Sequence, residues 1–417
     1  MAKYIPPHRR HLKHTDGGSF SSLPPAAALS FSVQRKLKLN SKKVEGVSEC
    51  HHIACARHWV SKWFVVSSYD NDDHDQDVQL PFSIHLRDYT CEAIEQLYQK
   101  KSKILLFNGH PEKDGKFYTL KDPWLTIVEK VHEDLFISFQ SAKNEMCKDG
   151  PELKVPHFTF RFGKILFHGS PSIHLENVNK SGVVETALNP LKRTYYANVP
   201  KLFVEAILSE FVQNIGLEFE EETEYYHVKV YDKCRPRTAI SCRCTVNHAV
   251  GELDLNEIEL NKLRHLTADI SCLDKSLDLR LMLSSKRTVI SLNDDVKHSL
   301  NNLLKSAVID SEVRGGLRWP PGKESVDDRF FVIGSCHTKD KTFKNSCIRL
   351  KIRQADQFDF RTSTAEFTDE SSVRMIHLDN YLSDESSEVA LAPMVDMVRE
   401  TLKLIWNNLL CWEGSYT

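Results

Sequence analysis

Four glutamates at alternate positions are the residues of this chain best suited to holding a cation. They are Glu218, Glu220, Glu222 and Glu224. Because successive side chains of a β-strand point to opposite faces, this spacing predicts four carboxylates projecting from one face of a strand. Hard divalent cations such as Mg²⁺ and Mn²⁺ prefer oxygen ligands of this kind. We call these four residues the glutamate comb.

The comb supports a hypothesis of metal-dependent phosphate chemistry. Alternating glutamates on inward-facing strands hold the divalent ion of tunnel-type triphosphatases, and basic residues on neighbouring strands would then receive a triphosphate. The candidates are Arg243, Arg264, Arg280, Lys286 and Arg287. The alternative is structural, namely a solvated strand face or an edge strand that like charges protect against pairing. Glu221 interrupts the alternation on the other face and favours this alternative.

The first 48 residues are strongly basic, although the whole chain has a net charge of only −2. They hold nine Lys or Arg against Asp16 and Glu45, so this segment carries +7 and the remainder −9. The segment is rich in Pro and Ser and lacks periodicity, which predicts a disordered arm. Cationic flexible chains bind RNA by neutralising phosphates, and Pro6-Pro7 also suits docking onto a protein. The predicted contacts are Tyr4, Arg9, Arg10, Lys13, Arg35, Lys36, Lys38, Lys42 and Lys43.

Two further segments contain metal-binding residue types but not the spacing of a metal site. Residues 50–52 (Cys-His-His), Cys55 and His58 have a C-x4-C-x2-H spacing that matches no standard zinc finger. The Asp-rich segment 70–77 lacks the central glycine of a calcium loop. We therefore predict no metal ligands in either segment.

Composition indicates an ordinary globular protein. Of the 417 residues, 41% are hydrophobic and 27% are charged. The eleven cysteines are scattered through the chain, which is typical of free thiols in a reducing compartment. No apolar run approaches the roughly 18 residues that a membrane-spanning helix needs. These features predict an intracellular protein of the cytoplasm or nucleus.

Residues 264–286 predict a β-hairpin with a defined register. With a turn at Asp274 and Lys275, partner residues have numbers that sum to 549. Apolar residues then face one another on one side, and polar residues, including the pair Asp269 and Arg280, face one another on the other. A one-residue slip would destroy this separation. The hairpin predicts an antiparallel sheet with one buried face.

The periodicity of the remaining chain predicts an α+β fold with mainly antiparallel sheet, flanking helices and the disordered arm. Helices are expected from Asp122-Pro123 to Gly150, from Val199 to Ile215 and from Asp294 to Val308. A glycine at a switch of apolar parity, Gly163, predicts a bend in a strand. The expected regions are the arm (1–48), an N-terminal α+β region (49–195), an antiparallel sheet region (196–363), an acidic loop (364–388) and a C-terminal helix (389–417).

Several long runs of the sequence resemble a family of plant proteins known only as a domain of unknown function. They are YIPPHRR (4–10), RFGKILFHGSPS (161–172), DISCLDKSLDLRLMLSSKR (269–287), GGLRWPPGK (315–323) and FDFRTST (358–364). The resemblance covers most of the chain. It implies no activity, cofactor or site residue.

Three functional hypotheses follow from the sequence. The first is a non-enzymatic intracellular protein whose basic arm binds RNA or a protein partner, with no catalytic residue and no cofactor. The second is a metal-dependent phosphohydrolase that uses the glutamate comb, Arg280 and Mg²⁺ or Mn²⁺. The third is a scaffold protein whose C-terminal helix pairs with another chain through an apolar stripe. The stripe consists of Val395, Val398, Leu402, Ile405 and Leu409.

Overall fold

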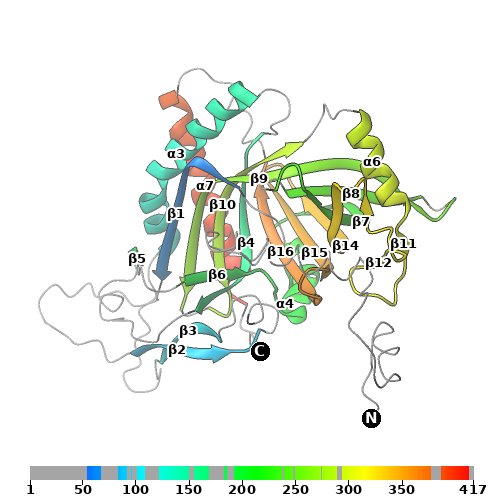
Figure 1. Ribbon diagram of the computed structural model, residues 1–417. Helices are drawn as coiled ribbons and strands as arrows, with labels where there is room; N and C mark the ends of the chain where they lie inside the picture. The colour runs from blue at the N-terminus through cyan, green and yellow to red at the C-terminus, as the bar shows by residue number, and fades with distance from the viewer. Residues whose placement is uncertain are drawn as a thin grey trace, which may run out of the picture. The chain divides into compact units, whose positions relative to one another are not determined.

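The computed structural model (Figure 1) describes most of the chain from residue 54 onward. The described residues are 54–66, 83–91, 95, 101–108, 122–149, 155–168, 183–185, 192–236, 239–247, 249–273, 275–288, 294–376 and 387–412. Residues from Glu45 to the C-terminus form one compact unit. The predicted basic arm, residues 50–52 and the Asp-rich segment 70–77 lie outside the described residues.

Strands dominate the described part of the chain. They are β1 (Ala54–Val66), β2 (Ser83–Tyr89), β3 (Ser102–Asn108), β4 (His157–His168), β5 (Val183–Glu185), β6 (Lys192–Tyr196), β7 (Glu218–Asp232), β8 (Ala239–Asn247), β9 (Glu252–Cys272), β10 (Asp278–Thr288), β11 (Val308–Ile309), β12 (Leu317–Arg318), β13 (Ser325–Val326), β14 (Phe330–Lys344), β15 (Ile348–Asp359) and β16 (Thr364–Met375). The helices are α3 (Pro123–Asp149), α4 (Lys201–Ala206), α5 (Val212–Asn214), α6 (Asp294–Lys305) and α7 (Ser387–Leu404). A π-helical turn (Ile207–Phe211) joins α4 to α5, and another (Ile405–Leu409) extends α7.

Eight antiparallel strands of the described residues close into a ring. The order around it is β10, β4, β16, β15, β14, β7, β8 and β9, and β9 pairs with β10 to complete the circuit. Strand β9 closes the ring because it has 21 residues: its first half pairs with β8 and its second half with β10. The parallel strand β1 adds to the second half of β9. The fold is therefore α+β with a mainly antiparallel sheet, as the sequence predicts.

The two faces of the ring differ in chemistry. On β7 and β8 the residues Val228, Val230, Cys242 and Cys244 point outward and pack against α6 in one hydrophobic cluster. On β4, β10 and β16 the outward residues pack with α3, α4 and α7 in a larger cluster. Because side chains alternate along a strand, the intervening residues face the interior of the ring, and most of them are polar. We call these faces the outer face and the inner face.

The predicted hairpin is confirmed with its register. Leu266 pairs with Leu283 and Asp269 pairs with Arg280, as the sum of 549 requires. The connection is longer than the predicted two-residue turn, since β9 ends at Cys272 and β10 begins at Asp278. A register shift after Leu283 pairs Ser284 with Arg264 instead of with His265. His265 consequently turns toward α3, where Ser138 Oγ donates to its carbonyl oxygen, and is not on the polar face that the sequence predicts.

Gly163, where the sequence predicts a bend, lies where β4 changes partners. Before Gly163 the strand pairs with β10 and β16, and after it with β3 and β6. A Cβ atom at this position would overlap the carbonyl oxygen of Tyr196. The backbones approach so closely that only glycine fits without displacement.

Two expectations about the C-terminal part are wrong. Residues 364–375 form strand β16 of the ring and not the start of an acidic loop. The apolar stripe of α7 is not free to pair with another chain, because Val398, Leu402, Ile405 and Leu409 are buried in the chain's own core and Val395 packs against it. In Figure 1, α7 lies beside α3 against one side of the ring. The described helices include none of the length and apolarity that crossing a membrane requires.

Candidate functional site

A cluster of basic side chains gathers on the inner face of the ring. Burial lowers the pKa of His157 on β4 well below its ordinary value, and the charges of Lys262, Arg374 and Lys286 lower it further. These three cations come from β9, β16 and β10, so three strands bring basic side chains toward a histidine on a fourth. Charges that shift the pKa of a group in this way lie near it.

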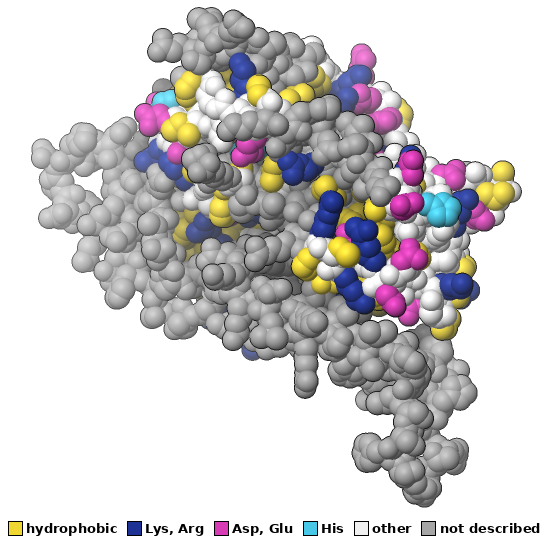
Figure 2. Space-filling model, turned by 45° about the horizontal axis from the view of Figure 1, so that its top comes forward, with side chains coloured by type: hydrophobic (Ala, Val, Ile, Leu, Met, Phe, Trp, Pro, Cys, Tyr) yellow, Lys and Arg dark blue, Asp and Glu magenta, His cyan; other side chains and the backbone are white. Residues whose placement is uncertain are grey.

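Strand β15 adds two more cations. Burial lowers the pKa of Lys351, and the charges of Arg353 and Lys286 contribute to the lowering. Arg349, two residues from Lys351 and therefore on the same face, lies directly opposite Arg374 of β16. We define the basic cluster as Lys262, Lys286, Arg349, Lys351 and Arg374, with His157 beside it. Figure 2 shows Lys and Arg side chains gathered on the described part of one face of the molecule.

Carboxylates contact this cluster, and one of them, Glu220, binds two cations. Lys344 and Arg349 both bind Glu220 Oε1, with nitrogen–oxygen distances of 2.9 and 2.6 Å. Lys286 Nζ lies 2.5 Å from Glu259 Oε1. Because Lys344 and Arg349 share one carboxylate, Glu220 neutralises only one of these two charges.

A buried network below the cluster holds Lys351 in place. Asp340, which is 1% exposed, accepts hydrogen bonds from Lys351 Nζ at 2.7 Å, Arg353 Nε at 2.9 Å and Tyr225 Oη at 2.5 Å. Its two cationic partners hold the pKa of Asp340 far below the ordinary range despite burial. Arg243 lies 4.1 Å above the Tyr225 ring. A network with every polar atom engaged fixes the side chains that line this part of the ring.

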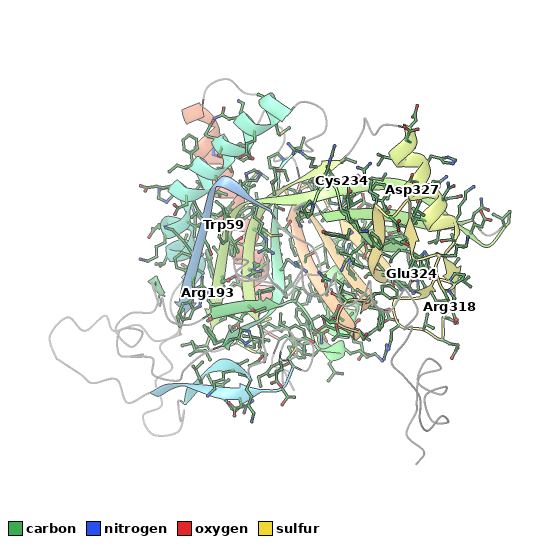
Figure 3. The ribbon with its side chains drawn as sticks, viewed as in Figure 1. Trp59, Arg193, Cys234, Arg318, Glu324 and Asp327 are labelled. Carbon is green, nitrogen blue, oxygen red and sulfur yellow. The ribbon has the colours of Figure 1, made fainter. Side chains whose placement is uncertain are left out.

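Another group of arginines lies on the same inner face. Arg280 Nε and Nη2 bind the carboxylate of Asp269 at 2.6 and 3.0 Å, which confirms the predicted pairing of these residues across the hairpin. Arg280 also lies over the Tyr195 ring, whose hydroxyl donates to the Arg161 carbonyl oxygen. Arg193, labelled in Figure 3, approaches Asp269 from β6 at 3.8 Å. Asp269 thus has cationic partners on two sides, Arg280 and Arg193, and we interpret the group as one that stabilises the fold.

The glutamate comb does not form one face, so this prediction is wrong. The register of β7 on β14 skips Glu220, which marks a β-bulge. Glu220 consequently turns toward Arg349, while Glu222 and Glu224 face solvent and pair with Lys341 and Lys339 of β14. Glu218 is exposed at the first position of the strand.

The structure separates Arg280 from the comb as well. Arg280 lies on β10, and β7 is separated from it by four strands (β4, β16, β15 and β14) in one direction around the ring and by two (β9 and β8) in the other. Lys286 and Arg243 do reach the inner-face networks described above. In the described residues no group of three or more His, Cys, Asp or Glu is placed to hold a metal ion.

Sequence reasoning missed Lys262, Arg349, Lys351 and Arg374. A signal for two of them was present, because the run Arg349-Leu350-Lys351-Ile352-Arg353 alternates basic and apolar residues over a predicted strand. Such alternation predicts a strand with one buried apolar face and one cationic face. Lys262 and Arg374 carry no such signal.

A serine–histidine–glutamate arrangement occurs elsewhere in the structure, in the layer between the ring and α3. Ser285 Oγ contacts His265 Nε2, and Glu145 Oε2 lies 3.7 Å from His265 Nδ1. His265 and Ser285 are both fully buried, and burial lowers the pKa of His265 to about 4. A nucleophile at this position has no access to substrate, so the arrangement is structural.

Comparison with known proteins identifies a family and a weak fold likeness. Residues 47–409 match the model of the family described as "Domain of unknown function (DUF7903)", and the chain belongs to that family. No curated protein matches the chain significantly.

Two solved structures illustrate the fold likeness. The S. pombe Pct1 RNA triphosphatase in complex with the Spt5 CTD is 11% identical with a TM-score of 0.41, covering 72% of this chain and 98% of that one. The RNA triphosphatase domain of a mimivirus mRNA capping enzyme is 9% identical with a TM-score of 0.29, covering 65% and 98%. Likenesses this weak carry no argument about function.

Proposed function

We propose that this member of the DUF7903 family binds a phosphorylated ligand on the inner face of its ring of strands, through direct ion pairs with the basic cluster. The observation that carries the proposal is that five cations from four strands line one face of the ring, and that three of them act on His157. Arg349 and Arg374 lie directly opposite each other on neighbouring strands, so one phosphate group can bind both guanidinium groups.

Phosphate suits this site better than a carboxylate ligand does. Arginine and lysine form short, charge-assisted hydrogen bonds with phosphate oxygens, and arginine binds two oxygens at once. A group with several phosphates presents enough oxygens to reach cations on β9, β10, β15 and β16 together. We therefore take inorganic tripolyphosphate as the simplest probe of the site.

Binding, and not metal-dependent hydrolysis, is the activity that the arrangement favours. Glu220, Glu259 and Asp340 contact the cluster or its supporting network, and lysine or arginine engages each of them. A divalent cation would have to displace these partners. The comb that would have supplied further carboxylates has two of its glutamates on the outer face.

The N-terminal arm gives this proposal a second component. Its nine Lys and Arg predict a sequence-independent affinity for RNA that adds to binding on the ring. The ligand class common to both parts is a phosphorylated polyanion.

Tripolyphosphate binding, measured by isothermal titration calorimetry in EDTA, tests the proposal. We expect Lys262→Ala and Arg374→Ala each to weaken binding about tenfold, since a lost charged hydrogen bond costs about 1.4 kcal/mol. Lys339→Ala and Lys341→Ala are the matched controls, because they remove exposed lysines from the outer face of a neighbouring strand.

Three outcomes would contradict the proposal. The first is no binding by the unmodified chain, and the second is equal loss in the cluster variants and the outer-face controls. The third is release of inorganic phosphate from tripolyphosphate when Mg²⁺ or Mn²⁺ is added, which would identify a phosphohydrolase.

A further inference from the structure

An exposed aromatic ring stands at the rim of the ring of strands, one residue before Glu220, which binds Lys344 and Arg349. Phe219 is the second residue of β7 and is 60% exposed, which is unusual for a phenylalanine in a regular strand. Strand β7 begins, and β14 ends, at the paired residues Glu218 and Lys344. Phe219 therefore lies one residue from the end of both strands.

We propose that Phe219 stacks against the base of a nucleotide whose phosphates bind Lys344 and Arg349. This inference rests on the proposed function and specifies its ligand as a 5′-phosphorylated nucleotide instead of an inorganic polyphosphate. The same chemistry is presented by a free nucleoside triphosphate and by the 5′ end of an RNA.

The β-bulge places the ring and the cations on two sides of one strand end. Phe219 pairs with Phe343 in the register, and Glu220, the residue that the register skips, turns its carboxylate to Lys344 and Arg349. Phe219 shares the outer face with Phe343 and the two cations are on the inner face, so the ligand must pass over the strand end to meet both. A nucleotide offers a flat base and an anionic phosphate group in one small molecule.

The ring of Phe219 is held in place by the protein core. Its centroid lies 5.8 Å from that of Phe343, with the two planes at 75°, and Phe343 packs against the main hydrophobic cluster. Edge-to-face packing of this kind holds the ring in position, while 60% of the Phe219 side chain stays exposed. A platform that is rigid before binding costs little conformational entropy when a base stacks on it.

The side-chain type of Phe219 also determines which ligands it can distinguish. It has no hydrogen-bonding group, so it accepts any base through stacking and does not read base edges. The expected ligand preference is for nucleotides over inorganic phosphates, with stacking strength as the only distinction among bases.

The test compares ATP with inorganic tripolyphosphate on the full chain, by calorimetry in EDTA. We expect the unmodified protein to bind ATP about tenfold more tightly than tripolyphosphate, since stacking on an aromatic side chain gives a gain of this order. Phe219→Ala should remove that difference without changing tripolyphosphate affinity, and Phe219→Trp should retain it. Phe367→Ala, which removes a 50% exposed phenylalanine of β16, is the matched control and should retain it as well.

The results separate this inference from the proposed function. Equal affinity for ATP and tripolyphosphate, or an unchanged preference in Phe219→Ala, overturns the stacking inference while the phosphate site stands. Absence of binding by either ligand overturns both. Stronger competition by a 5′-triphosphorylated RNA than by ATP identifies an RNA end as the source of the nucleotide, and weaker competition identifies a free nucleotide.

Discussion

At the scale of single residues, two carboxylates of the inner face each bind two cations. Asp340 is divided between Lys351 and Arg353, and Glu220 between Lys344 and Arg349. Breaking a buried ion pair is costly because it strands a charge, so each shared carboxylate fixes two cations at once. This sharing positions Lys351 and Arg349 of the basic cluster.

Residue-scale prediction from sequence failed at one position of the comb. The four glutamates do alternate in the sequence. A bulge, however, is a feature of the pairing between two strands, so the alternating pattern of one strand does not reveal it. Only the pairing with β14, which lies more than 110 residues away in the chain, shows that Glu220 leaves the row. The sequence of β7 alone does not say which strand it pairs with or in which register.

His265 provides a residue-scale prediction of stability against pH. Burial lowers its pKa from 6.5 to about 4 in the folded chain, so the unfolded chain takes up this proton at a higher pH than the folded chain does. Stability is therefore full above pH 6.5 and is lost as the pH falls toward about 4, by up to about 1.4 kcal/mol per pH unit. We expect His265→Gln to remove this contribution, measured by urea unfolding at pH 7, 6 and 5.

A second histidine variant controls for general effects of the substitution. His298 is exposed on α6, and His298→Gln should leave the pH dependence of the unfolding free energy as it is in the unmodified chain. An identical slope in His265→Gln and the unmodified chain would show that His265 does not resist protonation in the fold.

At the scale of elements, sequence periodicity predicted the elements that have one apolar face and missed one that does not. The hairpin of β9 and β10 has leucines on its outer face, and its register could be read directly. Strand β16 has Glu366, Thr368 and Glu370 on the inner face and also Asp369 and Ser371 on the outer one. With polar residues on both faces the period of two disappears, and an acidic loop becomes the simplest interpretation.

Gly163 provides the prediction at this scale. A methyl group there meets backbone atoms of Tyr196 and Ala197, which cannot rotate away as a side chain would. We expect Gly163→Ala to lower the free energy of unfolding by about 3 kcal/mol, because overpacked sites must shift the backbone. Chemical denaturation measures it.

Gly251 is the matched control. It has a φ of +70° and no atom within 4 Å of an added Cβ, so Gly251→Ala carries a conformational cost alone, about 1 kcal/mol. Equal losses in the two variants would mean that β4 and β6 are not in close contact at Gly163.

At the scale of the whole molecule, the ring unites strands that are far apart in sequence. The basic cluster draws on residues from 157 to 374, and no local window of the sequence contains more than two of its members. The fold class was predictable because the spacing of apolar residues within a segment indicates whether that segment is a strand or a helix. The site was not, because it exists only where β4, β9, β10, β15 and β16 meet.

The charge distribution of the whole chain gives the last prediction. Residues 1–48 carry +7 and the rest −9, so the arm should supply most of the salt-dependent affinity for RNA, while the basic cluster alone should bind tripolyphosphate. We expect deletion of residues 1–48 to weaken binding to a single-stranded RNA about tenfold or more in moderate salt and to flatten its dependence on salt, because fewer counterions are released. Tripolyphosphate affinity should stay the same. Fluorescence anisotropy of a labelled RNA across a salt series measures the RNA affinity, and calorimetry measures the tripolyphosphate affinity.

A deletion that leaves both the RNA affinity and its salt slope intact would show that the arm does not bind RNA. A deletion that abolishes tripolyphosphate binding would show that the ring does not hold the phosphate site by itself.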